Sequence, residues 1–455
     1  MKVDTGSTPR RPRLAQAIGR LAAAAMLTSA SGAGAVSFAE AYQAALRNDP
    51  VYRAQFYDNE AAKENVVIGR AGLLPSVSAS HMASRNRVDL EATDILGRPS
   101  LTHPDYISRS TVVQLRQPLL NLEALARYRQ RLVQSESSEA EFRGRGGEVV
   151  LRVAGAYLDA LLASEALALA QAQRDMYAEQ SQVNTHLFER GEGTRTDVLE
   201  TEARLDQAEA QVLEARDAVT VNRSSLAAVI GMDPGSLQPL APDFRIVSLR
   251  PAGFEEWKAL ALAHNADLEA ARLLVEAARF EVQRARAGHA PRVDLVVTYA
   301  KNDAETINTY TQNSVNRSIG VQVNVPLYAG GQISALARQA VDSLERARAD
   351  LQARTDRVTI ELRKAHSTVV SSVARIAALD KAESSAQLLI EATARSIKGG
   401  VRINLDLLNA QQQLTSVRRD LAQARHGYLF ALLRLRTAAG TLSPADVNEI
   451  ARYFR

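Results

Sequence analysis

The segment Ser318-Ile-Gly-Val-Gln-Val-Asn-Val-Pro-Leu327 decides the fold, because an apolar side chain stands at every second position. In an extended chain alternate residues fall on opposite faces. One face would carry Ile319, Val321, Val323, Val325 and Leu327, and the other would carry Ser318, Gly320, Gln322 and Asn324. This pattern predicts a β-strand with one apolar and one wet face, as strands in a membrane have.

A similar segment, Val113-Gln-Leu-Arg-Gln-Pro-Leu119, stands in the first half of the chain and aligns with Val321–Leu327. Other matched segments are Ala71-Gly72-Leu73-Leu74-Pro75 with Ala287-Gly288-His289-Ala290-Pro291, Arg190-Gly191 with Lys398-Gly399, and Asp197-Val198-Leu199 with Asp406-Leu407-Leu408. The separation between the matched segments is far longer than the period of a solenoid, which is roughly 20 to 50 residues. We therefore predict a duplicated half-molecule, whose halves sit around a common axis and do equivalent jobs.

The N-terminus has the pattern of a secretory signal peptide. Basic residues at Lys2, Arg10, Arg11 and Arg13 precede the apolar run Leu21–Leu27, and small residues end at Ala35. A disordered basic tail is the alternative, because Arg20 interrupts the apolar region. The predicted organisation is a signal peptide at 1–35, a first repeat at 36–235, a linker at 236–253, a second repeat at 254–440 and a C-terminal tail at 441–455.

Composition excludes several classes of protein. The 455 residues include 55 basic and 51 acidic side chains that are interspersed, which argues against a nucleic-acid partner, since that needs a clustered basic patch. There is no cysteine, so disulfides, cysteine metal sites and an acylated cysteine are excluded. The seven histidines lack His-Glu-x-x-His spacing, and Gly144-Arg-Gly-Gly147 follows no strand. We predict no enzyme activity, cofactor or metal.

Each half is predicted to contain a helix, two strands, a long helix and a shorter returning helix. Absence of proline and a small, alanine-rich apolar stripe favour the long helices, which turn at Gly191-Glu192-Gly193 and at Gly399-Gly400. The expected elements are a helix at about 37–71, strands at about 75–88, 108–119, 291–302 and 315–327, and helical hairpins at about 120–229 and 331–438. No segment after the signal approaches the ~20 apolar residues of a spanning helix.

Four strands cannot close a barrel with a lumen, because barrel diameter grows with strand number. Open edges would remain exposed, so several copies of the chain are expected to share one barrel. The alternative is a small soluble sheet packed on helices, which the low aromatic content of 5% disfavours. The predicted fold class is mainly α with a four-stranded β contribution.

Two tip motifs follow the long helices, Gly191-Glu-Gly-Thr-Arg-Thr-Asp-Val-Leu199 and Gly400-Val-Arg-Ile-Asn-Leu-Asp-Leu-Leu408. Together with the duplicated element order, they resemble the TolC-like outer-membrane efflux and secretion proteins over about 37–440. The resemblance implies a homotrimer with a transmembrane β-barrel in the lipid of a Gram-negative outer membrane, joined to a long periplasmic α-helical barrel. It also implies two partners, a periplasmic adaptor (membrane fusion) protein and an inner-membrane ABC transporter.

The resemblance assigns roles to three tip residues. Asp197 falls where the family has an aspartate that pairs with an arginine of a neighbouring protomer, and Arg402 falls where that arginine stands. Asp406 matches an aspartate that rings the tip constriction. Two positions depart from the pattern, because Ile397 replaces a gating tyrosine and Asn409 replaces a second ring aspartate. The alternative is that Asp197 and Arg402 are ordinary helix-end residues, since an aspartate near a helix N-terminus suits the dipole.

Three functions remain open. The first is a passive export channel, which serves either a type I secretion system or a drug pump. The second is a periplasmic adaptor, which two hairpins and four strands disfavour. The third is a soluble coiled-coil scaffold, which the signal peptide disfavours. The missing lipidation cysteine favours the type I secretion branch, whose members include exporters of large calcium-binding repeat toxins such as an adenylate cyclase toxin.

Overall fold

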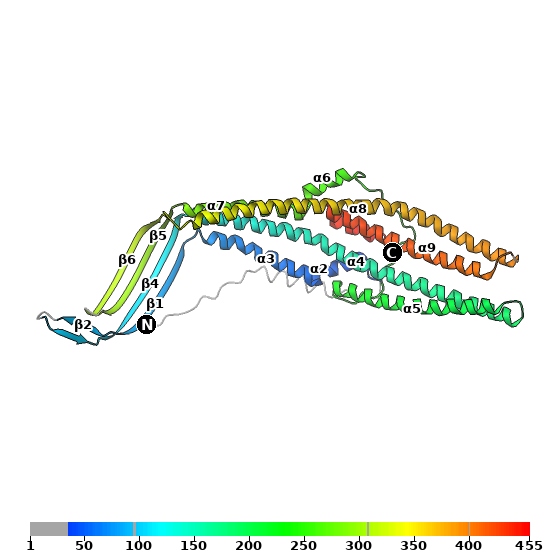
Figure 1. Ribbon diagram of the computed structural model, residues 1–455, viewed down its shortest axis with the longest axis horizontal. Coiled ribbons are helices and arrows are strands. Elements are labelled where there is room, and N and C mark those ends of the chain that lie inside the picture. The colour runs from blue at the N-terminus through cyan, green and yellow to red at the C-terminus, as the bar shows by residue number, and fades with distance from the viewer. Residues whose placement is uncertain (1–34, 94–96, 307–308, 400) are drawn as a thin grey trace, which may run out of the picture.

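The computed structural model describes residues 35–93, 97–306, 309–399 and 401–455. It is an elongated molecule with a curved sheet at one end and long helices that run from it to the other end (Figure 1). The predicted signal peptide, apart from Ala35, and the predicted tip residue Gly400 lie outside the described residues.

The two halves share one order of elements. The first half contains α2 (Phe38–Asn48), α3 (Pro50–Ala71), β1 (Ser76–Arg87), β2 (Leu90–Thr93), β3 (Pro99–Thr102), β4 (Asp105–Leu120), α4 (Leu122–Glu189) and α5 (Arg195–Ile230). The second half contains α6 (Phe254–His264), α7 (Ala266–Arg286), the short 3-10 helix η1 (Ala287–His289), β5 (Arg292–Thr306), β6 (Thr309–Asn324), α8 (Gln332–Lys398), α9 (Asn404–Ala438) and α10 (Pro444–Ala451).

Three features differ from the sequence expectation. The helix expected over 37–71 is two helices, because Asp49 caps the N-terminus of α3 and Pro50 occupies its first position. The polar loop expected between the first two strands contains the small hairpin β2–β3. The C-terminal tail contains α10, which begins with a capping box between Ser443 and Asp446.

The main sheet is antiparallel and has the strand order β1-β4-β5-β6. Val113–Leu119 lies in β4, and the matched segment lies in β6 as far as Asn324, on either side of β5. The strand expected to reach Leu327 ends three residues earlier, so Val325, Pro326 and Leu327 are not part of the sheet. Within one chain the sheet is open, with β1 and β6 at its edges, so it is not a closed barrel. One row of paired residues crosses all four strands and consists of Val77, Leu115, Val297 and Ile319.

The register gives the sheet two chemically distinct faces. The apolar face carries Val77, Val113, Leu115, Leu295, Val297, Tyr299, Ile319, Val321 and Val323, and the wet face carries Ser78, Ser80, Ser108, Ser110, Gln114, Thr298, Asn302, Asn316, Ser318 and Gln322. The side chain of Ile319 is 75% exposed, so the apolar face is uncovered in the single chain. On the wet face, Arg116 donates to the buried carboxylate of Asp294.

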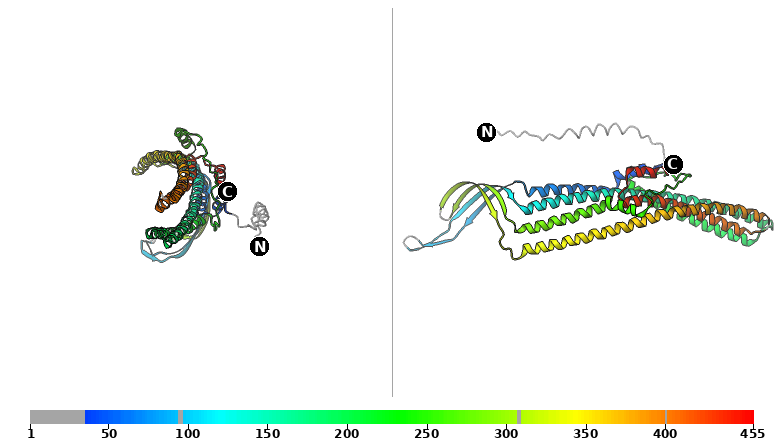
Figure 2. Two further views of the ribbon diagram at one scale, coloured as in Figure 1. Left: turned by 90° about the vertical axis from the view of Figure 1, so that its right-hand side faces the viewer. Right: turned by 90° about the horizontal axis from the view of Figure 1, so that it is seen from above.

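Each strand of the main sheet is followed or preceded by a helix in the same lateral order. Helices α3, α4, α7 and α8 lie side by side in a curved layer, and Figure 2 shows the arc end-on and the layer from above. Among the described residues, α4 contains an 18-residue window apolar enough to cross a membrane, although no such segment was expected from the sequence after the signal peptide. The buried part of this helix packs inside the protein, as the core helix of a bundle does.

The largest core lies midway along the helices, where the two ends of the described chain meet. The rings of Phe38, Tyr157 and Phe454 pack edge-on or tilted against one another at centroid distances of 5.3–5.9 Å. The Tyr157 hydroxyl donates to the carbonyl oxygen of Val36 at 2.9 Å, and burial raises its pKa to about 12. This core fixes the helical layer and orients both hairpins in one direction.

Candidate functional site at the helical tips

Both helical hairpins, α4–α5 and α8–α9, reach the end of the molecule opposite the sheet (Figure 1). At the first tip, Gly191 adopts a φ of 76°, and its N–H donates to the carbonyl of Phe188 at 2.9 Å. Glycine serves the same turn at Gly193, because a Cβ there would lie 3.1 Å from the Phe188 nitrogen. The chain therefore reverses within a few residues.

Asp197 takes part in the cap at the N-terminus of α5. Its N–H donates to the Thr194 hydroxyl at 3.1 Å, and its Oδ2 accepts from that hydroxyl at 2.6 Å and from the Thr194 N–H at 3.3 Å. This reciprocal arrangement is a capping box. Asp197 therefore has the helix-end role within the chain.

The second tip turns after Gly399, whose φ is −85° and whose N–H donates to the Arg395 carbonyl at 3.2 Å. Arg402 Nη1 lies 3.7 Å from Asp406 Oδ2, in the first turn of α9. Their side chains are 52% and 36% exposed, so this ion pair is wet and contributes roughly 0–1 kcal/mol. The structure thus brings two of the three predicted tip residues together, Arg402 and Asp406, and places Asp197 on the other hairpin.

A polar network near the tips was not predicted from the sequence. The buried Asn184 of α4 donates to the Asp197 carbonyl at 3.3 Å and to the Thr201 hydroxyl at 3.2 Å. Gln180 donates to Asn184 at 3.2 Å and to Asn404 of the second hairpin at 3.0 Å. Gln180 therefore joins α4 of the first hairpin to the start of α9 in the second.

Arg204 of α5 makes a second bridge between the hairpins. Its Nη2 donates to Asn409 Oδ1 of α9 at 3.1 Å, and its Nη1 donates to Gln412. Asn409, which the resemblance sets at the position of a ring aspartate, accepts a hydrogen bond from a cation within this chain. An apolar cluster of Tyr177, Ala208 and Leu408 supports the same contact from α4, α5 and α9.

Apolar side chains are exposed at both tips. Val401 is 82% exposed and Ile403 is 62% exposed beside the second turn, while Phe188 and Leu199 are exposed beside the first. Each tip therefore presents apolar side chains to solvent in the single chain.

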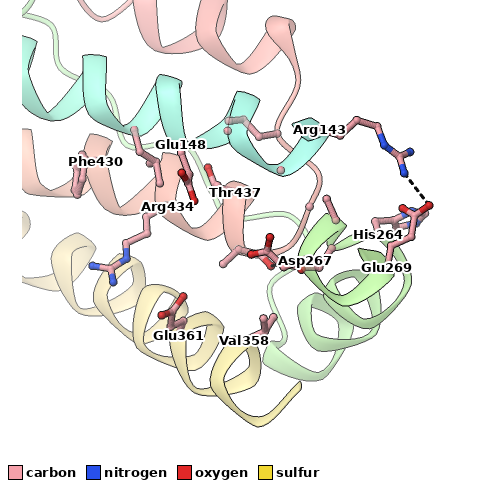
Figure 3. A pocket seen from close by; sticks show the side chains of 18 residues that line it. Arg143, Glu148, His264, Asp267, Glu269, Val358, Glu361, Phe430, Arg434 and Thr437 are labelled. Carbon is pink, nitrogen blue, oxygen red and sulfur yellow. Dashed lines mark hydrogen bonds and ion pairs between the residues drawn. The ribbon is translucent and has the colours of Figure 1, made fainter. Parts of the chain in front are cut away.

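A cavity of about 580 Å³ opens midway along the molecule between α4, α7, α8 and α9 (Figure 3). Its wall carries positively and negatively charged side chains. Arg143 and Glu269 form an ion pair at 2.7 Å, and α4, α8 and α9 add Glu148, Glu361 and Arg434. Thr437 lies so close to Gly147 that an added Cβ would stand 2.9 Å from its methyl group. Among the residues described, no three carboxylates or histidines are grouped to hold a metal ion.

Comparison with known protein families gives one match that covers most of the chain. The sequence profile described as Outer membrane efflux protein matches residues 41–232 and 257–441. The two matched segments correspond to the two repeats, and each ends at the returning helix of its hairpin.

Two curated relatives are similar over nearly the whole length. The Alkaline protease secretion protein AprF of Pseudomonas aeruginosa is 39% identical over 422 residues, which are 92% of this chain and 88% of that protein. The Proteases secretion protein PrtF of Dickeya chrysanthemi is 36% identical over 430 residues, 94% of this chain and 93% of that protein. Protein CyaE of Bordetella pertussis is similar at a lower level, 26% over 301 residues, 64% of this chain and 60% of that protein.

The fold is also similar to that of two solved membrane proteins. The outer membrane protein VceC of Vibrio cholerae superposes with a TM-score of 0.76 at 18% identity, covering 89% of this chain and 96% of that one. A membrane protein from Pseudomonas aeruginosa gives a TM-score of 0.77 at 20% identity, covering 89% and 90% of the two chains.

Proposed function

The chain belongs to the outer membrane efflux protein family, and we propose that it is the outer-membrane channel-tunnel through which a type I secretion system exports a protein. The observation that carries this proposal is the similarity, at 39% and 36% identity, to two proteins named for protease secretion. Both similarities extend across the sheet, the helical layer and the hairpins. The cargo class that fits best is therefore a secreted protein, such as a protease or a toxin.

Assembly of three copies would complete the sheet. The edges of the sheet in one chain are β1 and β6, and an edge strand presents unpaired N–H and C=O groups. In lipid every such group needs a partner, so β6 of one protomer would pair with β1 of the next until a barrel closes. The exposed apolar face would then contact lipid, and the wet face would line the lumen.

A ring of ion pairs at the tips would hold the resting channel closed. Among the described residues of one chain, the one ion pair of Arg402 is its wet contact with Asp406, so its guanidinium can exchange partners at little cost. The Asp197 carboxylate accepts from Thr194 through Oδ2, so its capping contacts use one of its two oxygens. Arg402 would reach the Asp197 of a neighbouring protomer, and three Asp406 side chains would line the constriction.

The tips would dock onto a periplasmic adaptor. Exposed Val401 and Ile403 provide apolar surface there, and the Arg402 carried between them would lose its latch contact when the adaptor covers the tip. Energy for transport would come from an inner-membrane ABC transporter bound to that adaptor. The chain itself would act as a passive conduit.

The proposal is tested by comparing proteins in the culture medium of the source bacterium with and without this gene. Loss of one large secreted protein, restored by the intact gene and accompanied by unchanged drug sensitivity, is the expected result. An unchanged set of secreted proteins with new sensitivity to dyes and detergents would instead establish a multidrug efflux duct. A drug pump is the alternative function within the same family.

A further inference from the structure

The charged residues on the apolar face of the sheet are confined to the half that is distant from the helices. The row Val77, Leu115, Val297 and Ile319 is entirely apolar. Moving away from the helices, the next row contains Arg317 beside Tyr299, the following row contains Lys301, and the row after that contains Arg109. Toward the helices, the same face carries Gln117, Leu295, Val293, Val321 and Val323 and no charge up to the ends of β5 and β6.

Arg109, Lys301 and Arg317 form a compact group on three neighbouring strands. Lys301 pairs in register with Thr111 of β4 and with Val315 of β6, so Arg109 and Arg317 are its diagonal neighbours. Diagonal neighbours in antiparallel strands lie about 7–8 Å apart, within reach of long side chains. All three residues are exposed. We call these three residues the basic group.

The basic group has little internal compensation. One carboxylate, that of Asp303, serves two of the three: it stands opposite Arg109 in the register and lies 4.0 Å from Lys301, at the limit of an ion pair. The Arg317 guanidinium lies 5.8 Å from the centre of the Tyr299 ring. Farther out on the same face, the carboxylate of Asp105 pairs with both Arg85 and Arg87. Among the described side chains of this face, five cations therefore stand against two carboxylates.

The basic group lies at the outer boundary of the lipid-facing band. The apolar stretch of β5 from Val293 to Tyr299 rises about 20 Å along the strand, close to the ~25 Å apolar band of an outer-membrane strand set. The helices extend into the periplasm, so the opposite strand ends face the outside. Cations at that boundary need anionic partners at the level of the lipid headgroups.

We propose that Arg109, Lys301 and Arg317 bind the phosphate groups of lipopolysaccharide in the outer leaflet of the membrane. This inference rests on the proposed insertion of the sheet in the outer membrane. Arginine presents paired N–H groups that match phosphate oxygens, and lysine adds a point charge. The excess of cations at one boundary of the face, and their absence from the other, favours a partner confined to one leaflet.

The test uses the purified full-length protein in a neutral detergent and fluorescently labelled rough lipopolysaccharide. The variant R109Q/K301Q/R317Q is expected to bind at least tenfold more weakly than the wild type. The control R53Q/R279Q/K381Q removes two arginines and one lysine from exposed positions of α3, α7 and α8, and it is expected to bind like the wild type. Lipopolysaccharide treated with phosphatase is expected to lose the wild-type affinity.

Two further measurements separate a loss of charge from other causes of weak binding. The charge-retaining variant R109K/R317K should keep most of the affinity, which separates lost charge from a misfolded sheet. Vesicles of phosphatidylglycerol should compete poorly. Equal binding by R109Q/K301Q/R317Q and the wild type, or an equal loss in the helix control, would overturn the proposal. Protein export is measured separately in cells, so normal lipid binding without export would overturn the proposed function alone.

Discussion

Asn48 and Asn265 make the same hydrogen bond in the two halves of the chain. The Asn48 Nδ2 donates to the carbonyl of Ile230, the last residue of α5, and the Asn265 Nδ2 donates to the carbonyl of Ala438, the last residue of α9, each at 2.9 Å. Each returning helix, α5 or α9, therefore ends against the residues just before a helix of the curved layer, α3 or α7. We call this contact the joint. The repeat in the sequence includes one joint in each half.

The joint in the second half depends on Gly440, and we predict that Gly440→Ala is strongly destabilising. Gly440 has a φ of 68°, and a Cβ there would lie 2.3 Å from the His264 carbonyl oxygen, which is backbone and cannot rotate away. Strain of this kind is expected to cost on the order of 3 kcal/mol or more. Thermal unfolding of the purified protein, followed by circular dichroism, measures the loss.

The matched control for that measurement is Gly427→Ala in α9. Nothing lies within 4 Å of a Cβ at Gly427, and its helical backbone accepts alanine. Alanine is favoured over glycine inside a helix by about 1 kcal/mol, so this variant should unfold at or above the wild-type temperature. Identical unfolding of the two variants would contradict the close contact at the joint.

The elements that follow from local patterns could be predicted from the sequence. Strict alternation in Ser318–Leu327 predicts a strand, and β6 (Thr309–Asn324) covers most of that segment. The break between α2 and α3 also had a sequence signal, because Asp49-Pro50 is a capping residue followed by proline. The continuous apolar stripe over 37–71 outweighed that signal in the prediction.

The contacts between the two hairpins could not be predicted in the same way. Gln180 and Asn404 meet only because α4 and α9 converge at a particular angle, which no local pattern encodes. The repeat does not pair Arg204 with Gln412 either. Arg204 stands seven residues past Asp197, whereas Gln412 stands six residues past the matched Asp406, so the equivalent of Arg204 is Gln413.

Arg402→Ala is predicted to raise the resting conductance of the channel in a planar lipid bilayer. If three Asp197–Arg402 pairs hold the tip closed and each contributes up to about 1 kcal/mol, the ratio of open to closed channels should rise by up to about 100-fold. Single-channel recording measures this ratio directly.

Arg395→Ala is the control for the latch. Arg395 is also exposed near the end of α8, and its ion pair with Glu391 at 3.6 Å lies within one helix. Its removal takes away the same charge without touching the predicted pair, so conductance should stay at the wild-type level. An unchanged closed level in Arg402→Ala would refute the latch.

Asp197→Asn and Thr194→Ala are predicted to separate the two roles of Asp197. An asparagine keeps an acceptor for the capping box but loses the charge, so the channel should open with little change in stability. Thr194→Ala removes the cap and keeps the charge, so stability should fall by about 1 kcal/mol while the resting conductance stays low. Equal conductance in both variants would show that Asp197 acts only as a cap.

Alkaline pH is predicted to destabilise the central core through Tyr157. Its pKa is raised to about 12 by burial, above the ordinary value near 10, so the stabilisation is complete below pH 10 and is lost as the pH rises toward 12. Tyr157→Phe should unfold more easily at pH 7, by about 1 kcal/mol, because the Val36 carbonyl loses the closer of its two donors and keeps the Gln238 N–H at 3.4 Å.

Between pH 10 and 12, the stability of Tyr157→Phe should therefore fall less steeply than that of the wild type. Tyr57→Phe, at a side chain that is 63% exposed, should follow the wild-type pH dependence. Circular dichroism at a series of pH values compares the three proteins, and parallel curves for all of them would contradict the role of Tyr157.

Arg204→Ala is predicted to loosen the tips without unfolding the molecule. Arg204 joins α5 to Asn409 and Gln412 of α9, and its other contact is a weak one with Glu200 at 3.9 Å in its own helix. Hydrogen bonds to a charged donor contribute about 1.5–3 kcal/mol, so backbone amides of the tips should exchange hydrogen roughly tenfold faster or more. Arg216→Ala, an exposed position on the same helix, removes an equal charge away from α9 and should leave exchange unchanged. Faster exchange confined to the tips would show that Arg204 couples the hairpins, so that a partner pulling on one hairpin would move both. Wild-type exchange in Arg204→Ala would contradict this and would mean that Gln180 and the Tyr177 cluster are enough to hold the hairpins together.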